Sequence, residues 1–174
     1  MHVIPLALAG LKKICPCRYE DARGFFQETY RKELYAQHGI GIDFVQDNHS
    51  YSKKGVVRGM HFQRHPGQAK LVGVISGRIF DVAVDIRLSS PSFGKWEGVY
   101  LEKGEQLWIP VGFAHGFCVV SGDAHVIYKV SAPYDPAQEV GFAFDDPDVG
   151  INWPILSPVV SERDRCQPAF KEVL

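Results

Sequence analysis

Residues 80–87 read Phe-Asp-Val-Ala-Val-Asp-Ile-Arg, and this alternation decides the class of fold. The even-numbered residues are all apolar and share one face of an extended strand, while the odd-numbered residues share the other face. We expect Arg87, on that second face, to meet solvent. For Asp81 and Asp85 the pattern leaves two positions open, a solvated surface or the inner wall of a barrel with a polar interior. In both cases the stretch predicts a β-strand with one buried apolar face.

Similar segments, rich in Val, Ile, Phe and Tyr, recur along the chain at intervals of about 8 to 12 residues. They cover residues 43–48, 56–63, 70–76, 78–86, 96–101, 106–110, 115–120, 125–131 and 140–144. Turn-forming residues separate them, among others at 76–77 and 121–123. Only residues 30–38, followed by Gly39, have the composition of a helix. The tail from 152 to 174 is expected to be irregular, with a short turn near 161–163. Many strands without helical spacers predict an all-β sandwich or barrel.

The composition fits one globular domain over residues 1–174. The chain is 45% hydrophobic and 22% charged, with 19 Lys and Arg against 20 Asp and Glu. A net charge of −1 argues against non-specific binding to nucleic acid or to an anionic membrane. No apolar run approaches the roughly 18 residues of a membrane span. An anionic ligand would therefore have to be met by a local cluster of cations.

The start of the chain and its cysteines indicate a cytoplasmic protein. Lys12 and Lys13 follow the mildly apolar first residues, whereas a secretory signal carries its positive charge before the apolar run. The four cysteines do not have the spacing of a zinc site. We expect them to be free thiols in a reducing compartment.

Four histidines stand where chemistry could need them: His49, His61, His65 and His115. His61 shares a strand face with Gln63, and an imidazole there can act as a general base, bind a metal or only form a hydrogen bond. The pattern alone leaves these three roles open. A metal-binding cupin usually presents a His-x-His pair, and here Gln63 occupies the second position. Two imidazoles without a carboxylate bind a divalent ion poorly, so we expect no metal.

Four cations could hold a phosphate group: Arg23, Arg58, Lys70 and Arg163. The chain contains neither of the glycine-rich loops that cradle phosphates through the main chain. A bound phosphate would therefore be held by side chains, for which the guanidinium fork is well suited. Spacing alone also allows ordinary surface ion pairs, so this pattern leaves both interpretations open.

A series of motifs between residues 20 and 168 occurs in the same order as in one enzyme family. They are DARGFF (21–26), FVQDNHS (44–50), VRGMHFQ (57–63), KLV (70–72), FDVAVDIR (80–87), SPSFGKW (90–96), LWIP (107–110), GFAHGF (112–117), YK (128–129) and INWP (151–154). In them the chain resembles the dTDP-4-dehydrorhamnose 3,5-epimerases, cupin-fold enzymes of dTDP-L-rhamnose synthesis. The resemblance implies a cupin-type jelly-roll β barrel with one or two short peripheral helices, usually a homodimer, with no metal and no organic cofactor.

The same resemblance implies roles for individual residues. His61 would be the catalytic base, Asp164 its orienting carboxylate, Tyr128 the proton donor, and Lys70 a cation near the C4 oxygen of the sugar. Tyr134 would stack on the thymine ring. The implied nucleotide and phosphate contacts are Arg23, Glu28, Gln46, Asp47, Asn48, Arg58, His115, Glu139 and Arg163.

These residues suit the inversion of C3 and C5 of a dTDP-4-keto-6-deoxyhexose through an enolate. A base must remove the proton next to the C4 carbonyl, a cation must stabilise the enolate oxygen, and an acid must return a proton from the other face. One alternative is an epimerase of a related nucleotide sugar that acts at C5 or C3 only. Another is a non-catalytic sugar-binding cupin, which would need no acid and base. The poor ligand set opposes a third, a metal-dependent cupin oxygenase.

Overall fold

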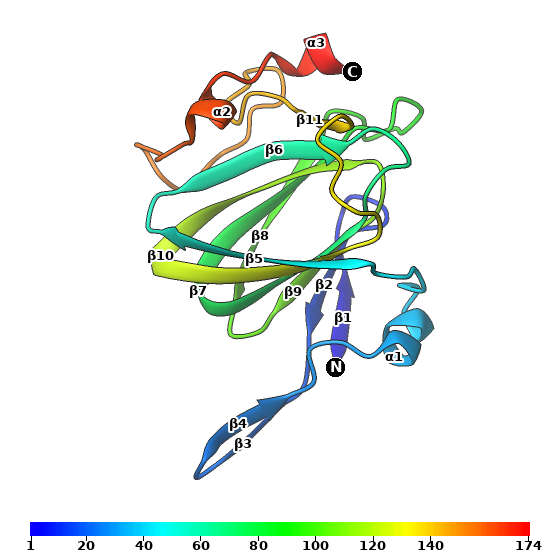
Figure 1. The fold of residues 1–174 in the computed structure, drawn as a ribbon, viewed down its shortest axis with the longest axis vertical. Helices are drawn as coiled ribbons and strands as arrows, with labels where there is room; N and C mark the ends of the chain where they lie inside the picture. The colour runs from blue at the N-terminus through cyan, green and yellow to red at the C-terminus, as the bar shows by residue number, and fades with distance from the viewer.

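Two long antiparallel strands, β7 (Lys70–Asp85) and β10 (Phe113–Val130), form the spine of the computed structural model, which describes residues 1–174 (Figure 1). The other strands are β1 (His2–Pro5), β2 (Lys12–Cys15), β3 (Arg18–Asp21), β4 (Gly24–Gln27), β5 (Gln46–Lys53), β6 (Val57–Gln63), β8 (Trp96–Glu102), β9 (Gln106–Ile109) and β11 (Glu139–Gly141). The helices are α1 (Lys32–Gln37), α2 (Glu162–Arg165) and α3 (Phe170–Val173).

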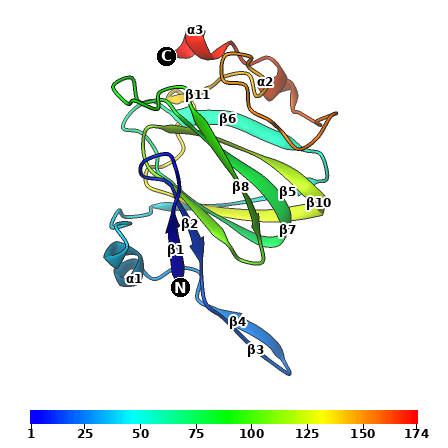
Figure 2. The ribbon, with the colours of Figure 1, turned by 180° about the vertical axis from the view of Figure 1, so that it is seen from behind.

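Both spine strands change partners midway, and this closes the sheet into a barrel. The first half of β7 pairs with β9 and its second half with β8. The first half of β10 pairs with β6 and its second half with β5. Beyond these, β2 and β1 follow β9, and β11 follows β6. The strands cross in the two opposite views of the barrel, with the helices at its periphery (Figures 1 and 2). The predicted all-β fold is thereby confirmed.

The turns predicted at residues 76–77 and 121–123 are wrong. Gly77 still pairs with Ala124, and the register between β7 and β10 shifts on either side of this pair. Gly77 has a φ of +84°, and a Cβ added there would lie 2.1 Å from the Asp123 carbonyl oxygen. Only glycine fits this close approach. The small residues therefore make bulges at which both strands bend from one half of the sheet to the other.

Three apolar clusters surround and fill the barrel. The inner one includes Val72, Val126 and Phe117 and lies between the halves of the sheet. A second covers the outside of β6, β7 and β10, where the C-terminal tail contributes Phe142 and Phe170. The third lies under α1 and comprises Ile14, Tyr35, Ile40, Ala69, Leu71 and Trp108. Apolar side chains thus pack on both faces of the barrel wall. Polar side chains line the remaining part of the barrel interior.

The structure decides between the two positions that the sequence left open for Asp81 and Asp85. The apolar residues of 80–87 contact the C-terminal tail, so Asp81 and Asp85 turn into the barrel, and both are fully buried. Asp85 accepts hydrogen bonds from Arg87, Ser90 and Ser92 and thereby fixes the loop after β7. Arg87 is only half-buried and pairs with Asp85 at 2.7 Å, so its expected solvent position is met in part.

The four N-terminal strands, β1 to β4, were not predicted from the sequence. β1 and β2 form a hairpin that joins the sheet through β9. β3 and β4 form a separate two-stranded hairpin that projects away from the barrel (Figures 1 and 2). Tyr19, Phe25 and Phe26 on this hairpin are exposed. Exposed aromatic side chains on a hairpin that does not pack against the core are typical of an interaction surface.

The helices are short and peripheral. α1 lies within the predicted residues 30–38, and α2 begins at the turn predicted near 161–163. α3 was not predicted and packs Phe170 against the outside of the barrel. None of these helices has the length and apolar character needed to cross a membrane.

Candidate active site

A pocket of about 550 Å³ opens into the barrel between β5, β6, β7 and β10, with α2 and the segment after β10 at its rim. The structure brings together here eleven of the fourteen residues that the sequence singled out: Gln46, Asn48, Arg58, His61, Lys70, His115, Tyr128, Tyr134, Glu139, Arg163 and Asp164. They come from parts of the chain more than 100 residues apart, and the roles predicted for them require this convergence.

His61 and Asp164 form a close pair at one wall of the pocket. His61 Nε2 lies 2.7 Å from Asp164 Oδ1, and the Gly59 N–H donates to the other carboxylate oxygen at 3.3 Å. Ser161 caps α2 by accepting from the Asp164 N–H, which fixes the carboxylate in place. Burial alone would raise the pKa of Asp164, but the hydrogen bonds from His61 and Gly59 outweigh it and hold that pKa below 3.8. Asp164 is therefore a charged acceptor that orients the imidazole.

Gly59 lets the strand of His61 approach its neighbour. Its φ is +125°, and a Cβ added there would lie 2.6 Å from the Cα of Gly116 on β10. Two facing glycines thus allow β6 and β10 to pass in close contact. His115, the residue just before Gly116 on β10, is the register partner of His61.

Lys70, His115 and Asp81 form a buried polar group next to His61. His115 Nε2 lies 2.5 Å from Asp81 Oδ1, while Asp81 Oδ2 is buried without a hydrogen-bond partner. Burial lowers the pKa of Lys70 from 10.5 to about 8, although the charges of Glu139 and Asp81 oppose the shift. Burial likewise lowers the pKa of His115. This arrangement places a cation of reduced pKa and a polar imidazole side by side among the buried residues that line the pocket.

Tyr128 lines the pocket from β10, opposite Asn48 on β5 in the strand register. Burial raises the pKa of its phenol above 10, so the group keeps its proton at neutral pH. Arg58 stands at the same wall, where Ser52 Oγ and the Tyr51 carbonyl oxygen hold its guanidinium at 2.9 and 3.2 Å. A protonated phenol and a fixed guanidinium thus share the pocket with His61.

Tyr134, Glu139 and Arg163 form the outer rim of the pocket. The Tyr134 hydroxyl donates to Glu139 Oε2 at 3.1 Å, and Arg163 pairs with the same oxygen. Tyr134 is about half exposed, at 49%. A flat ring at an open rim is suited to stack on a ligand that reaches out of the barrel.

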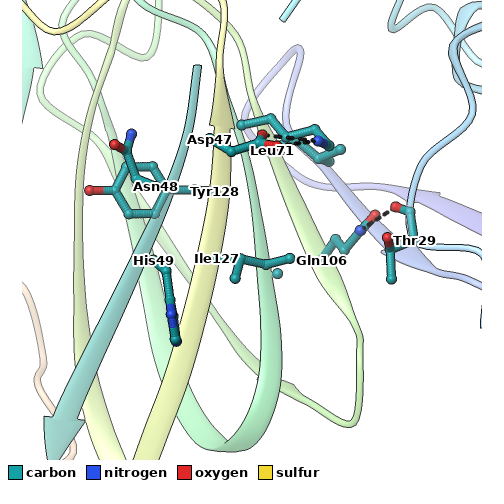
Figure 3. A pocket seen from close by; sticks show the side chains of 10 residues that line it. Thr29, Asp47, Asn48, His49, Leu71, Gln106, Ile127 and Tyr128 are labelled. Atoms are coloured by element: carbon teal, nitrogen blue, oxygen red, sulfur yellow. Dashed lines mark hydrogen bonds and ion pairs between the residues drawn. The ribbon is translucent and has the colours of Figure 1, made fainter. Parts of the chain in front are cut away.

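Three predicted contacts lie outside this pocket. Asp47 points to the outer face of β5, where it pairs with Lys129 at 2.9 Å beside a smaller cavity of about 320 Å³. Figure 3 shows its side chain directed away from those of Asn48 and Tyr128. Since Asp47 and Asn48 are consecutive strand residues, their side chains must face opposite ways.

The other two belong to the projecting hairpin and its base. Arg23 is 90% exposed at the hairpin tip and pairs with Asp21. Glu28 follows β4, pairs with Arg31 at 3.4 Å and lines a groove beside α1. Neither residue reaches the pocket of its own chain.

The structure also adds polar residues that sequence reasoning did not assign. Ser50 lines the pocket, and its hydroxyl is buried without a partner. Its position two residues after Asn48 on one strand could have revealed it. Gln68, Phe117 and Ser161 also line the pocket. Of the other histidines, His49 faces outward and bonds to His125 at 2.9 Å.

Comparison with known proteins agrees with this geometry. The sequence profile of the dTDP-4-dehydrorhamnose 3,5-epimerase family matches residues 5–172. An enzyme of that name from Shigella flexneri is 47% identical over 168 residues, which cover 94% of this chain and 93% of the relative. A dTDP-4-dehydrorhamnose 3-epimerase from Streptomyces niveus is 40% identical over 169 residues, which cover 95% of this chain and 82% of the relative.

Solved structures agree in fold as well as in sequence. The crystal structure of a dTDP-6-deoxy-D-glucose-3,5-epimerase from Legionella pneumophila, in complex with dTDP-4-keto-L-rhamnose, superposes with a TM-score of 0.96 at 44% identity. The match covers 99% of this chain and 94% of that one. The barrel is thus the cupin-like jelly roll of these enzymes. On sequence and structure alike, the chain belongs to the dTDP-4-dehydrorhamnose 3,5-epimerase family.

Proposed function

We propose that this chain is a cofactor-free epimerase that inverts C3 and C5 of a dTDP-4-keto-6-deoxyhexose. The observation that carries the proposal is the convergence of His61, Lys70, Tyr128 and Asp164 on one pocket. A base held by a carboxylate, a buried cation and a protonated phenol are the groups that enolate chemistry needs. Inversion at C3 or at C5 leaves the oxidation state of the substrate unchanged.

The chain would invert each carbon in two proton transfers. His61 removes the proton next to the C4 carbonyl, and Asp164 holds its tautomer and stabilises the resulting imidazolium. The electron pair moves onto the C4 oxygen, where the Lys70 ammonium stabilises the enolate. Tyr128 then delivers a proton to the other face of the carbon, and the C4 carbonyl forms again. Before the next inversion the His61 imidazolium releases its proton to solvent and the Tyr128 phenolate takes one up from solvent. Asn48 and Ser50 offer hydrogen bonds to the sugar hydroxyls.

The rim of the pocket would hold the nucleotide. Tyr134 stacks on thymine, and Arg58 and Arg163 bind the diphosphate, with Arg163 exchanging its pairing to Glu139 for the ligand. The nucleotide contact implied for His115 is better replaced by a contact to the sugar, because His115 lies deep in the pocket and bonds to Asp81. Binding energy at the rim would keep the ring in register at the reacting end.

The chain would act as a homodimer in the cytoplasm, with no nucleic acid or membrane partner. Arg23 and Glu28 cannot reach the pocket of their own chain, and the hairpin that carries Arg23 projects with Phe25 and Phe26 exposed. A second copy would cover these aromatic rings and receive Arg23 and Glu28 at its own pocket. Light scattering of the purified protein tests the dimer.

The alternative is inversion at a single carbon. It is favoured by one observation, the presence of 3-epimerases among the similar proteins, including the relative from Streptomyces niveus. Both activities use the same base and acid. Incubation with dTDP-4-keto-6-deoxyglucose in deuterated water, followed by NMR, separates them. The proposal expects deuterium and inversion at both C3 and C5, and label at one carbon alone would support the alternative.

A further inference from the structure

The segment that carries Tyr134 has no regular structure to hold it. Residues 131–138 connect β10 to β11 with bends and one turn only. Their main-chain groups must find hydrogen-bond partners outside a helix or a sheet. The position of the Tyr134 ring therefore depends on what anchors this segment.

Three glutamine side chains provide the anchor, and we call them the glutamine clamp. The hydrogen bonds join Gln46 Oε1 to the Tyr134 N–H at 3.0 Å, Gln63 Oε1 to the Asp135 N–H at 3.3 Å, and Gln68 Nε2 to the Ala132 carbonyl oxygen at 2.8 Å. Residue 133 is proline and offers no N–H. The clamp thus holds the main chain two residues before Tyr134, at Tyr134 itself and one residue after it.

Each clamp residue lies two positions from a residue of the proposed reaction site. Gln63 follows His61 on β6, so both side chains share one face of the strand. Gln46 precedes Asn48 on β5 in the same way, and its Nε2 also donates to Asn48 Oδ1 at 2.8 Å. Gln68 precedes Lys70 at the start of β7. Hydrogen bonds therefore anchor the irregular segment to the same strands that carry the base, His61, and the cation, Lys70.

We propose that the glutamine clamp positions Tyr134 on the nucleotide and that Gln63 is a positioning residue for nucleotide binding. The inference rests on the proposed function, because it assumes that Tyr134 stacks on the base. Gln63 is only 8% exposed and does not line the pocket, so it acts through the Tyr134 segment and not by touching the ligand. The side-chain amides carry no charge at any ordinary pH, so the anchor holds its geometry across the working range of the enzyme.

The test replaces Gln63 by methionine, which keeps the length of the side chain and removes the acceptor. The matched control is Gln138→Met in the same segment, because the side chain of Gln138 forms no hydrogen bond. Calorimetric titration with dTDP should show about fivefold weaker binding by Gln63→Met, the loss of one hydrogen bond of about 1 kcal/mol, and unchanged binding by the control. The KM for the dTDP-sugar should rise by a similar factor while kcat is retained.

A double-mutant cycle separates positioning from general destabilisation. In a Tyr134→Ala background the Gln63→Met change should have no further effect on dTDP affinity, because the ring that it positions is gone. Equal weakening in both backgrounds, or no weakening in either, would overturn the proposal. If the wild-type protein bound no dTDP at all, the proposed function would fail instead.

Hydrogen exchange without nucleotide tests the anchor by itself. Peptides that cover residues 131–138 should exchange faster in Gln63→Met than in Gln138→Met, because the Asp135 N–H loses its acceptor. Equal exchange in the two variants would overturn the clamp whatever the outcome with dTDP.

Discussion

The buried Lys70 should set an alkaline limit to activity, a pH above which kcat/KM falls. Lys70 is 8% exposed, and burial lowers its pKa to about 8. At pH 7 about nine-tenths of the molecules carry the ammonium, and at pH 9 about one-tenth do. If the cation stabilises the enolate, kcat/KM should fall about tenfold for each pH unit above 8. Tyr128 cannot cause a limb that begins near pH 8, because burial raises the pKa of its phenol above 10.

The same titration should affect stability with the opposite sign. The folded lysine loses its proton near pH 8, whereas the unfolded chain keeps it until about pH 10.5. Between these values the unfolded state binds more protons, so the free energy of unfolding rises with pH. The displacement of the pKa corresponds to a rise of at most about 3 kcal/mol. A falling rate in a protein that becomes more stable cannot be ascribed to denaturation.

The assay compares wild type with two variants from pH 6 to pH 10.5. Lys70→Arg keeps the positive charge over this range, so its activity, although reduced, should show no limb near pH 8. Lys70→Met has no titrating group there, so its free energy of unfolding, measured with urea, should lack the rise seen in wild type. A limb near pH 8 that persisted in both variants would refute the assignment of the limb to Lys70.

Four further changes test the remaining parts of the site. His61→Ala should abolish deuterium incorporation from solvent at C3 and C5 and leave dTDP affinity nearly unchanged, and residual exchange near the wild-type rate at either carbon would contradict a single base. Tyr128→Phe should retain exchange but lose inversion, as judged by NMR of the product, and inversion at an unimpaired rate would remove Tyr128 from its role. Arg58→Ala should raise the Kd for dTDP by about 10- to 150-fold, since one charge-assisted contact contributes about 1.5 to 3 kcal/mol. Phe26→Ser should shift the protein toward monomer in light scattering and lower kcat/KM, and an unchanged dimer would contradict the contact role of the hairpin.

Alternation along strands made much of the site predictable. In residues 57–63 the polar positions 61 and 63 share one face, and both side chains serve the pocket or its rim. Tyr128 shares a face with Val126 and Val130, which are buried inside the barrel, so its phenol had to point inward as well. Here the period of two is sufficient, because it depends on local geometry alone.

The alternation of polar and apolar residues does not predict which distant elements come into contact. Asp164 lies 103 residues after His61, and spacing gives no sign that α2 brings the two together. Only the family resemblance pointed to that pair. The pairing of Asp81 with His115 was missed for the same reason, since alternation assigns a face but not a neighbour. The four-residue strands β1 to β4 are too short for a period to show.

The two spine strands also determine how this chain must fold. β7 and β10 each pair with three strands, and their own pairing joins Phe113 to Asp85 and Val130 to Lys70. The pairs are up to 60 residues apart along the chain. Large loops must close before such non-local contacts can form, so folding should be slow. Because neither half of the barrel can keep its core without both strands, the chain should unfold in one cooperative transition, and the pocket should disappear together with the last of the sheet.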